Sequence, residues 1–156
     1  MFLIRKAVFK TWRALSAVIE GLLGKTSLGV RILALRGDEV LLVRMTYLRD
    51  WYLPGGGVDR GESLRAAALR ELREETAYEA SGLELHGIYF NGRKQRSDHV
   101  ALFVTRNLSA VPGLKPDHEI AEVGFFRTDA LPEGTSPATR ARIAEVVAGL
   151  APAEFW

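Results

Sequence analysis

The stretch from Pro54 to Tyr78 constrains the fold of this chain more than any other part of it. It opens with three consecutive glycines, Gly55, Gly56 and Gly57. After a second glycine turn, it continues as a run of strong helix formers without a breaker. A glycine loop that leads into a helix presents backbone N–H groups that favour anions. The stretch therefore predicts a loop–helix unit with an anion site at the start of the helix.

Three glutamates of the predicted helix, Glu71, Glu74 and Glu75, are spaced to share one face. Like charges this close repel one another in water. A bound cation would convert that repulsion into attraction, and oxygen ligands favour Mg²⁺ or Mn²⁺ over zinc. Arg70 lies four residues before Glu74, where it can orient a carboxylate. We therefore expect a metal site that also receives the phosphates of a substrate.

Apolar residues on two predicted helices indicate a sheet between them. In the first helix they recur at helical spacing and are expected to pack against that sheet. The second helix is predicted from Ser136 to Leu150, with a serine cap and a proline in its first turn. The side chains expected to face inward are Leu64, Ala68, Leu69 and Leu72 on the first helix, and Ile143, Val146, Val147 and Leu150 on the second.

The glycine loop and the acidic helix together resemble the signature of the Nudix hydrolase family. That signature is a Gly, five residues, a Glu, seven residues, then Arg-Glu-apolar-x-Glu-Glu-x-Gly-apolar. Gly56 and Glu62 match its first two fixed positions, and the block from Arg70 to Glu75 matches the third. Ala77 and Tyr78 stand where the family has the Gly and an aliphatic residue. Because that Gly normally closes the helix, the departure concerns the helix exit more than the chemistry.

The resemblance implies a fold, an activity and a set of site residues. The fold is α/β, a mixed β-sheet sandwiched between α-helices as an α/β/α sandwich, here over a domain at residues 26–156. The activity is that of a MutT-like, metal-dependent pyrophosphohydrolase, which cleaves a nucleoside diphosphate linked to another moiety with Mg²⁺ or Mn²⁺. Glu71 is implied as general base or metal ligand, and Arg70 as the residue that orients the carboxylates. The other implied residues are Gly56, Glu74 and Glu75 as metal ligands, Gly55 and Gly57 as substrate-binding positions, and Glu62 as a partner within the motif.

A further acidic ligand is expected in a loop beyond the acidic helix, as the family resemblance implies. Glu119 and Glu122 are the candidates, followed by the aromatic pair Phe125 and Phe126. We favour Glu119 as the metal ligand. A plain surface charge is the alternative for either residue.

Aromatic and basic residues on both sides of the signature are candidates for substrate binding. Tyr47, Trp51 and Tyr52 precede the glycines, and we take Trp51 as the candidate for stacking on a base. Core packing is the alternative, since aromatics commonly fill cores. Arg93, Lys94 and Arg96 form a basic turn, with Arg93 and Arg96 as candidate phosphate ligands. A solvated hairpin tip is the alternative for the turn, and a structural role is favoured for His99.

Residues 1–25 predict a separate, basic amphipathic helix. Its apolar stripe runs through Ile4, Val8, Trp12, Leu15 and Ile19, and four basic residues lie between these positions. We expect the stripe to pack on the domain or on a second copy in a homodimer. Attachment to a membrane surface is the less favoured alternative.

The composition is that of an ordinary globular domain, with 156 residues, a formal net charge of +2 and no Cys. The small net charge does not indicate nucleic-acid binding, and the absence of Cys excludes a Cys nucleophile or a thiolate metal site. No run is long enough for a transmembrane helix, Glu20 interrupts a signal-like segment, and a cytoplasmic protein is expected.

Several substrates and two other function classes stay open. Marks of several Nudix subfamilies are absent, so nucleoside triphosphates, nucleotide sugars and RNA 5′ ends remain as substrates. A catalytically inactive nucleotide sensor is one alternative function. A peripheral interaction protein that acts through its first helix is the other.

Overall fold

The computed structural model describes residues 26–92 and 98–156. The predictions for residues 1–25 and for Arg93, Lys94 and Arg96 lie outside this part of the chain. Neither helix of the described ranges is long and apolar enough to cross a membrane. In chain order the elements are β1 (Ser27–Arg36), β2 (Glu39–Met45), β3 (Trp51–Tyr52), α2 (Leu64–Thr76), β4 (Tyr78–Ala80), β5 (Glu84–Asn91), β6 (Asp98–Thr105), β7 (Leu108–Ala110), β8 (Ile120–Arg127) and α3 (Pro137–Val147).

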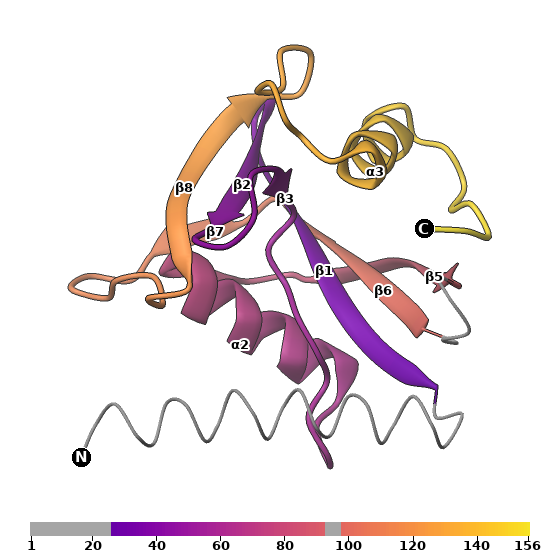
Figure 1. Cartoon of the computed structure of the whole chain (residues 1–156), viewed down its shortest axis with the longest axis horizontal. Helices are drawn as coiled ribbons and strands as arrows, with labels where there is room; N and C mark the ends of the chain where they lie inside the picture. The colour runs from indigo at the N-terminus through magenta and orange to yellow at the C-terminus, as the bar shows by residue number, and fades with distance from the viewer. Residues whose placement is uncertain (1–25, 93–97) are drawn as a thin grey trace.

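The mixed sheet is built around β1 and divides into two arms (Figure 1). In one arm β1 runs parallel to β6, which pairs antiparallel with β5. β1 meets β2 only at their shared hairpin, and β2 then pairs with β8 and β3 to form the other arm. The glycine loop takes the edge of β1 that β2 leaves, because the N–H groups of Val30 and Ile32 donate to the carbonyls of Gly56 and Pro54, each at 2.9 Å. The topology therefore places this loop where the two arms part.

The two helices cover opposite faces of the sheet (Figure 1). The buried cluster that includes the apolar side of α2 contains Ile32, Leu41 and Phe103. The cluster beneath α3 contains Leu33 and Ile143. Consecutive residues of β1 thus enter different cores, as the two-residue period of a strand requires. The predicted mixed sheet between helices is confirmed.

Three apolar side chains that were predicted to face the core are exposed instead. Leu69 is 37% exposed, because the contact face of α2 is centred on Ala68 and its buried neighbours. Val147 and Leu150 are 54% and 60% exposed. α3 ends at Val147, and Gly149 has a left-handed φ of 66° that turns the chain before Leu150. Helical spacing gave the direction of each apolar face but overestimated its width.

A buried carboxylate lies beneath α3. Glu145 accepts hydrogen bonds from the Tyr89 hydroxyl at 2.5 Å and from the Ala153 N–H at 3.0 Å. Its carboxylate also lies 3.2 Å from His86 Nε2 and 3.4 Å from Arg142 Nη1. Glu145 therefore joins three parts of the chain, namely α3, β5 and the C-terminal tail.

The C-terminal tail pairs with the edge of β5. The Phe90 N–H donates to the Glu154 carbonyl at 2.9 Å, and the Trp156 N–H donates to the Phe90 carbonyl at 3.0 Å. Trp156 packs edge-on against Tyr89, with ring centroids 5.4 Å apart. The tail thus covers a strand edge that would otherwise be open to pairing with another chain.

Both ends of α2 are capped. The Ser63 side chain accepts a hydrogen bond from the Ala66 N–H at 3.1 Å, as an N-cap serine does. At the other end, Ala77 is left-handed, with φ 59° and ψ 25°, and its N–H donates to the Arg73 carbonyl at 3.0 Å. The left-handed conformation costs a residue with a Cβ about 1–2 kcal/mol. Ala77 therefore closes the helix in the conformation that a Gly would adopt without that cost.

Candidate active site

Two of the three glycines lie so close to neighbouring elements that a side chain would not fit there. Gly55 has a φ of 139°, and a Cβ there would lie 2.2 Å from the Val30 carbonyl oxygen. A Cβ on Gly56 would lie 2.6 Å from Glu71 Oε1. The loop can therefore lie between β1 and α2 only while both positions lack a side chain. The Gly56 carbonyl, a predicted metal ligand, accepts a hydrogen bond from the Val30 N–H at 2.9 Å and is directed toward β1.

Arg70 links the glycine loop to the acidic face of α2. Its Nε and Nη2 donate to the two carboxylate oxygens of Glu62 at 2.9 and 2.8 Å, which is a bidentate pair. Its Nη2 also donates to the Gly57 carbonyl at 3.1 Å, and its Nη1 donates to Glu71 at 2.7 Å. The predicted contact with Glu74 is longer, at 3.5 Å. Arg70 is thus positioned to orient the carboxylates, with Glu62 as its main partner.

The carboxylate of Glu62 is held in its charged form. Hydrogen bonds from Arg70 and from the Asp59 N–H lower the pKa of Glu62 to about 2. A carboxylate that is ionised and fully engaged in this way is a poor acceptor for a proton. Glu62 therefore has a structural role here: it links the Asp59 N–H, in the turn before α2, to Arg70 of α2.

Glu75 has the opposite electrostatic environment. It accepts a hydrogen bond from the Gly55 N–H at 2.8 Å. Burial nevertheless raises the pKa of Glu75 to about 7, and the negative charges of Glu71 and Glu119 add to the effect. This side chain holds a proton near neutral pH that a bound cation would displace.

Glu71 lies between the Gly56 backbone and Arg70. Burial raises the pKa of Glu71, although the Arg70 guanidinium opposes the shift, and the charge of Glu74 raises it further. Glu74 itself is exposed on the same face. A carboxylate with a raised pKa is better suited to accept a proton near neutral pH, which agrees with the role of base expected for Glu71.

The two candidate acids of the later loop lie in different places. The backbone of this loop joins α2 and the segment after β2, because the Asp117 N–H donates to the Glu74 carbonyl and the Thr46 N–H donates to the Glu119 carbonyl, each at 2.8 Å. Glu119 is close enough to raise the pKa of Glu75. Glu122 lies in β8 and pairs with Arg44. The structure thus brings Glu119, rather than Glu122, to the acidic face.

The chemistry of this face fits a divalent cation. Glu71, Glu74 and Glu75 supply carboxylate oxygens, which are the ligands that Mg²⁺ and Mn²⁺ prefer. Within residues 26–92 and 98–156, no three acidic or histidine side chains already surround a common point. Glu71 is held by Arg70, and Glu75 is held by the Gly55 N–H. Metal binding here therefore requires these carboxylates to turn from their present donors.

Trp51 packs beside β8. Its ring meets Phe126 edge-on, with centroids 4.7 Å apart, and the Arg44 guanidinium lies 5.6 Å from its centroid. The side chain is half-buried at the edge of the core beneath α3. Tyr47 is 63% exposed on the loop between β2 and β3. Stacking on a base stays a prediction for Trp51, which is partly occupied by core packing.

His99 has a packing partner in the neighbouring strand. It lies in β6 opposite Phe90, with ring centroids 5.5 Å apart. The part of the chain that the structure describes gives His99 no acid or nucleophile within hydrogen-bond distance. This placement agrees with the structural role favoured for His99.

A family model for the NUDIX domain matches residues 25–148. The match includes the glycine loop, the acidic helix, both arms of the sheet and α3. The chain belongs to the Nudix hydrolase family. Nudix structures also share its fold: a NUDIX hydrolase from Nitrosomonas europaea superposes with a TM-score of 0.71 at 24% identity, covering 81% of this chain and 92% of that one.

Curated relatives match this Nudix domain over part of their length. A Bacillus subtilis protein provisionally named 8-oxo-dGTP diphosphatase is 41% identical over 63 residues, which are 40% of this chain and 42% of the relative. The NAD-capped RNA hydrolase NudC of Pseudomonas aeruginosa is 33% identical over 109 residues, which are 65% of this chain and 36% of the relative. The chain thus spans less than half of either relative.

One residue of this Nudix site was not predicted from the sequence. Arg31 lies in the apolar strand β1, and its Nη1 donates to the Gly55 carbonyl. Burial lowers the pKa of the Arg31 guanidinium, while the charges of Glu75 and Glu71 oppose that shift. A cation in the middle of an apolar run, between Val30 and Ile32, was the signal that could have pointed to it.

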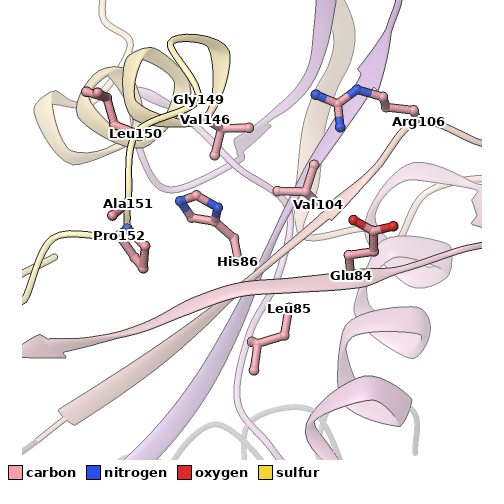
Figure 2. A pocket seen from close by; sticks show the side chains of 10 residues that line it. All are labelled: Glu84, Leu85, His86, Val104, Arg106, Val146, Gly149, Leu150, Ala151 and Pro152. Atoms are coloured by element: carbon pink, nitrogen blue, oxygen red, sulfur yellow. The ribbon is translucent and has the colours of Figure 1, made fainter.

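A hollow on another part of the surface lies apart from the acids (Figure 2). It is lined by residues of β5, of β6 and the turn that follows it, and of the end of α3 and the segment after it, with His86 directed into it. No residue that lines it belongs to the glycine loop or to α2. His86 also contacts the buried Glu145, so the hollow borders the structural cluster beneath α3 and not the Nudix motif.

Proposed function

We propose that this protein is a metal-dependent pyrophosphohydrolase that cleaves a nucleoside diphosphate linked to another moiety. One observation carries the proposal: two neighbouring carboxylates of α2, Glu71 and Glu75, have raised pKa values beside a glycine loop. That arrangement offers both a proton acceptor and oxygen ligands for a cation beside the same glycine loop.

The residues divide the work between binding a cation and moving a proton. Mg²⁺ or Mn²⁺ would be held by Glu74, Glu75 and Glu119, with the Gly56 carbonyl as a further ligand once it is released from the Val30 N–H. When bound, the cation neutralises charge on the diphosphate. Glu71 accepts the proton of the attacking water, and Arg70 keeps Glu71 in place through the 2.7 Å hydrogen bond. The leaving phosphate departs with the oxygen that bridged the two phosphorus atoms.

The names of the relatives indicate a type of linkage in the substrate but not one particular substrate. Their names include an 8-oxo-dGTP diphosphatase and an NAD-capped RNA hydrolase. Both substrates contain a phosphoanhydride next to a nucleoside. We therefore infer the same linkage for this chain, with the group beyond the second phosphate left to experiment.

A panel assay tests the proposal. Nucleoside triphosphates, nucleotide sugars, dinucleotides and a capped RNA 5′ end are each incubated with the full chain and Mg²⁺ or Mn²⁺, and released phosphate is measured after phosphatase treatment. Hydrolysis of at least one compound by the wild type, lost in Glu75→Gln, is expected. Binding of a nucleotide without any hydrolysis would instead support the inactive sensor.

The metal ligands have their own test. Mn²⁺ titrations of Glu74→Gln and Glu75→Gln should show affinity that falls about tenfold or more, since each change removes one charge and keeps the shape. The matched control is Glu79→Gln, whose carboxylate pairs with Arg73 at the surface. Unchanged Mn²⁺ affinity in both Gln variants would place the metal elsewhere.

A further inference from the structure

We propose that Arg31 binds the diphosphate of the substrate directly, from the side of the glycine loop opposite the acidic face of α2. This inference rests on the function proposed above and adds a residue to the same site. Three observations carry it, namely the position of the guanidinium, its lack of a paired carboxylate and the groups that surround it.

The guanidinium lies at the glycine loop itself. Arg31 Nη1 donates to the Gly55 carbonyl, while the Gly55 N–H donates to Glu75 Oε2 at 2.8 Å. The backbone of Gly55 thus contacts a cation at its carbonyl oxygen and an anion at its N–H. The close packing of Gly55 on the Val30 carbonyl, where a Cβ would lie 2.2 Å from the oxygen, keeps this residue in place.

Arg31 is a half-buried cation without a contacting counter-ion. Over residues 26–92 and 98–156, no carboxylate oxygen lies within 4 Å of its guanidinium, whereas Arg70 reaches four carboxylates. The contact with Gly55 uses one of the five N–H donors of the side chain. Burying a charge that has no partner costs free energy. A bound anion offsets that cost, and a planar guanidinium suits two oxygens of one phosphate.

The surroundings of Arg31 locate that anion. The guanidinium interacts electrostatically with Glu75 and Glu71 of α2 and with Tyr47 and Tyr52. It is therefore near both the acidic face and the aromatic segment that precedes the glycines. A diphosphate bound to a cation on the acidic face presents its remaining negative charge toward this position.

Two simpler roles for Arg31 make different predictions. If Arg31 only holds the Gly55 peptide, its loss disturbs the loop and weakens the binding of metal and of diphosphate alike. If it only balances the charge of Glu75, its loss strengthens metal binding and leaves diphosphate binding unchanged. If Arg31 contacts the diphosphate directly, its loss keeps or strengthens metal binding and weakens diphosphate binding.

The experiment compares Arg31→Gln and Arg31→Lys with the wild-type full chain. The first probe is Mn²⁺ alone, and the second is methylene diphosphonate, which has a P–C–P bridge that cannot be hydrolysed, in saturating Mn²⁺. Both are titrated by calorimetry. The control variant is Arg65→Gln, because Arg65 also donates to a backbone carbonyl, that of Leu83, but on the side of α2 that faces Phe103.

The expected results separate the three roles. Arg31→Gln should bind Mn²⁺ as tightly as wild type or a few-fold more tightly, because a nearby positive charge is gone. It should bind the diphosphonate about 10- to 100-fold more weakly, the usual scale for a charge-assisted hydrogen bond. Arg31→Lys should bind the diphosphonate with an affinity between those of the wild type and Arg31→Gln, since lysine keeps the charge and loses the planar fork of donors. Arg65→Gln should match wild type with both probes.

Three results would overturn the inference: unchanged diphosphonate affinity in Arg31→Gln, an equal loss of both probes in that variant, or no diphosphonate binding by the wild type. Failure of the proposed function is a separate result. A wild type that hydrolyses nothing in the nucleotide panel but binds the diphosphonate through Arg31 refutes the enzyme and keeps the contact.

Discussion

The two faces of the sheet carry charged clusters of opposite design. On the α2 face, four carboxylates lie within 4 Å of one guanidinium, that of Arg70, and burial raises the pKa of Glu71 and Glu75. On the α3 face, a single carboxylate, that of Glu145, has several donors. Burial would raise its pKa too, but hydrogen bonds from Tyr89 and from the Ala153 N–H outweigh that effect and lower it.

The number of donors per carboxylate distinguishes a reactive cluster from a structural one. Glu145 is stable as an anion because its neighbours satisfy it, so it holds α3, β5 and the tail together. Glu71 shares the Arg70 guanidinium with three other acids, and Glu75 accepts a hydrogen bond from a neutral donor, the Gly55 N–H. A cluster of this kind gains from a cation or a proton, which is the property that hydrolysis of a diphosphate requires.

Removing the proposed base should have the largest effect. Glu71→Gln is expected to lower kcat by about 10²- to 10⁴-fold, the usual contribution of a general base, with a small change in KM. Steady-state kinetics on a hydrolysed panel compound measure both constants, and Glu79→Gln serves as the surface control. If KM alone rises, Glu71 binds substrate and the base is Glu119, the later acid that lies near Glu75.

Removing the hub of the structural cluster should affect stability and not chemistry. Glu145→Ala leaves the Tyr89 hydroxyl without its acceptor and the Arg142 guanidinium without its paired carboxylate, and it is expected to destabilise the fold by about 3 kcal/mol. Urea unfolding gives this value, and kcat below the transition should stay within about twofold of wild type. An equal urea midpoint for wild type and variant would show that the cluster contributes nothing net. Glu84→Ala, at an exposed position of β5, is the control.

The pH dependence of stability should have opposite signs in the two clusters. Without metal, the folded state keeps a proton on Glu75 up to pH about 7, while the unfolded state releases it near 4.5. Stability should therefore fall as the pH rises from 4.5 to 7, by about 1–3 kcal/mol at the usual 1.4 kcal/mol per pKa unit. The lowered pKa of Glu145 predicts a loss of stability as the pH drops below 4.5.

Melting temperatures in EDTA across this pH range measure both slopes. Glu75→Gln should reduce the slope above pH 4.5 and leave the part that the raised pKa of Glu71 contributes, and Mn²⁺ should reduce it in the wild type by displacing the proton. The same slope in the wild type and in Glu75→Gln would assign the titration to another group.

The smallest expected effect lies at the exit of α2. Ala77→Gly should stabilise the protein by about 0.5–1 kcal/mol, because glycine adopts a φ of 59° without steric cost. Ala66→Gly, at an exposed position inside the same helix, is the matched control and should destabilise by about 1 kcal/mol. Urea midpoints of the two variants should move in opposite directions. Destabilisation by both would mean that Ala77 contributes packing that outweighs its strain.

The sequence alone determined the local units of this protein. The run from Gly55 to Glu75 predicted a loop, a helix and three acids on one face, because those features depend on residues within a few turns of one another. The second helix followed from hydrophobic periodicity for the same reason. The confirmed sandwich and the family are consequences of these local signals.

Tertiary structure decided everything that depends on residues far apart in the chain. Arg31 reaches the Gly55 carbonyl across 24 positions, and Glu145 meets Tyr89 across 56. Leu69 and Leu150 stay exposed because no element of residues 26–92 and 98–156 covers them fully. Periodicity states which way a side chain points from its own helix or strand, but the partner it meets depends on how the sheet divides and where the tail returns. Whether a charge is satisfied, and hence its pKa, is therefore a property of the folded chain.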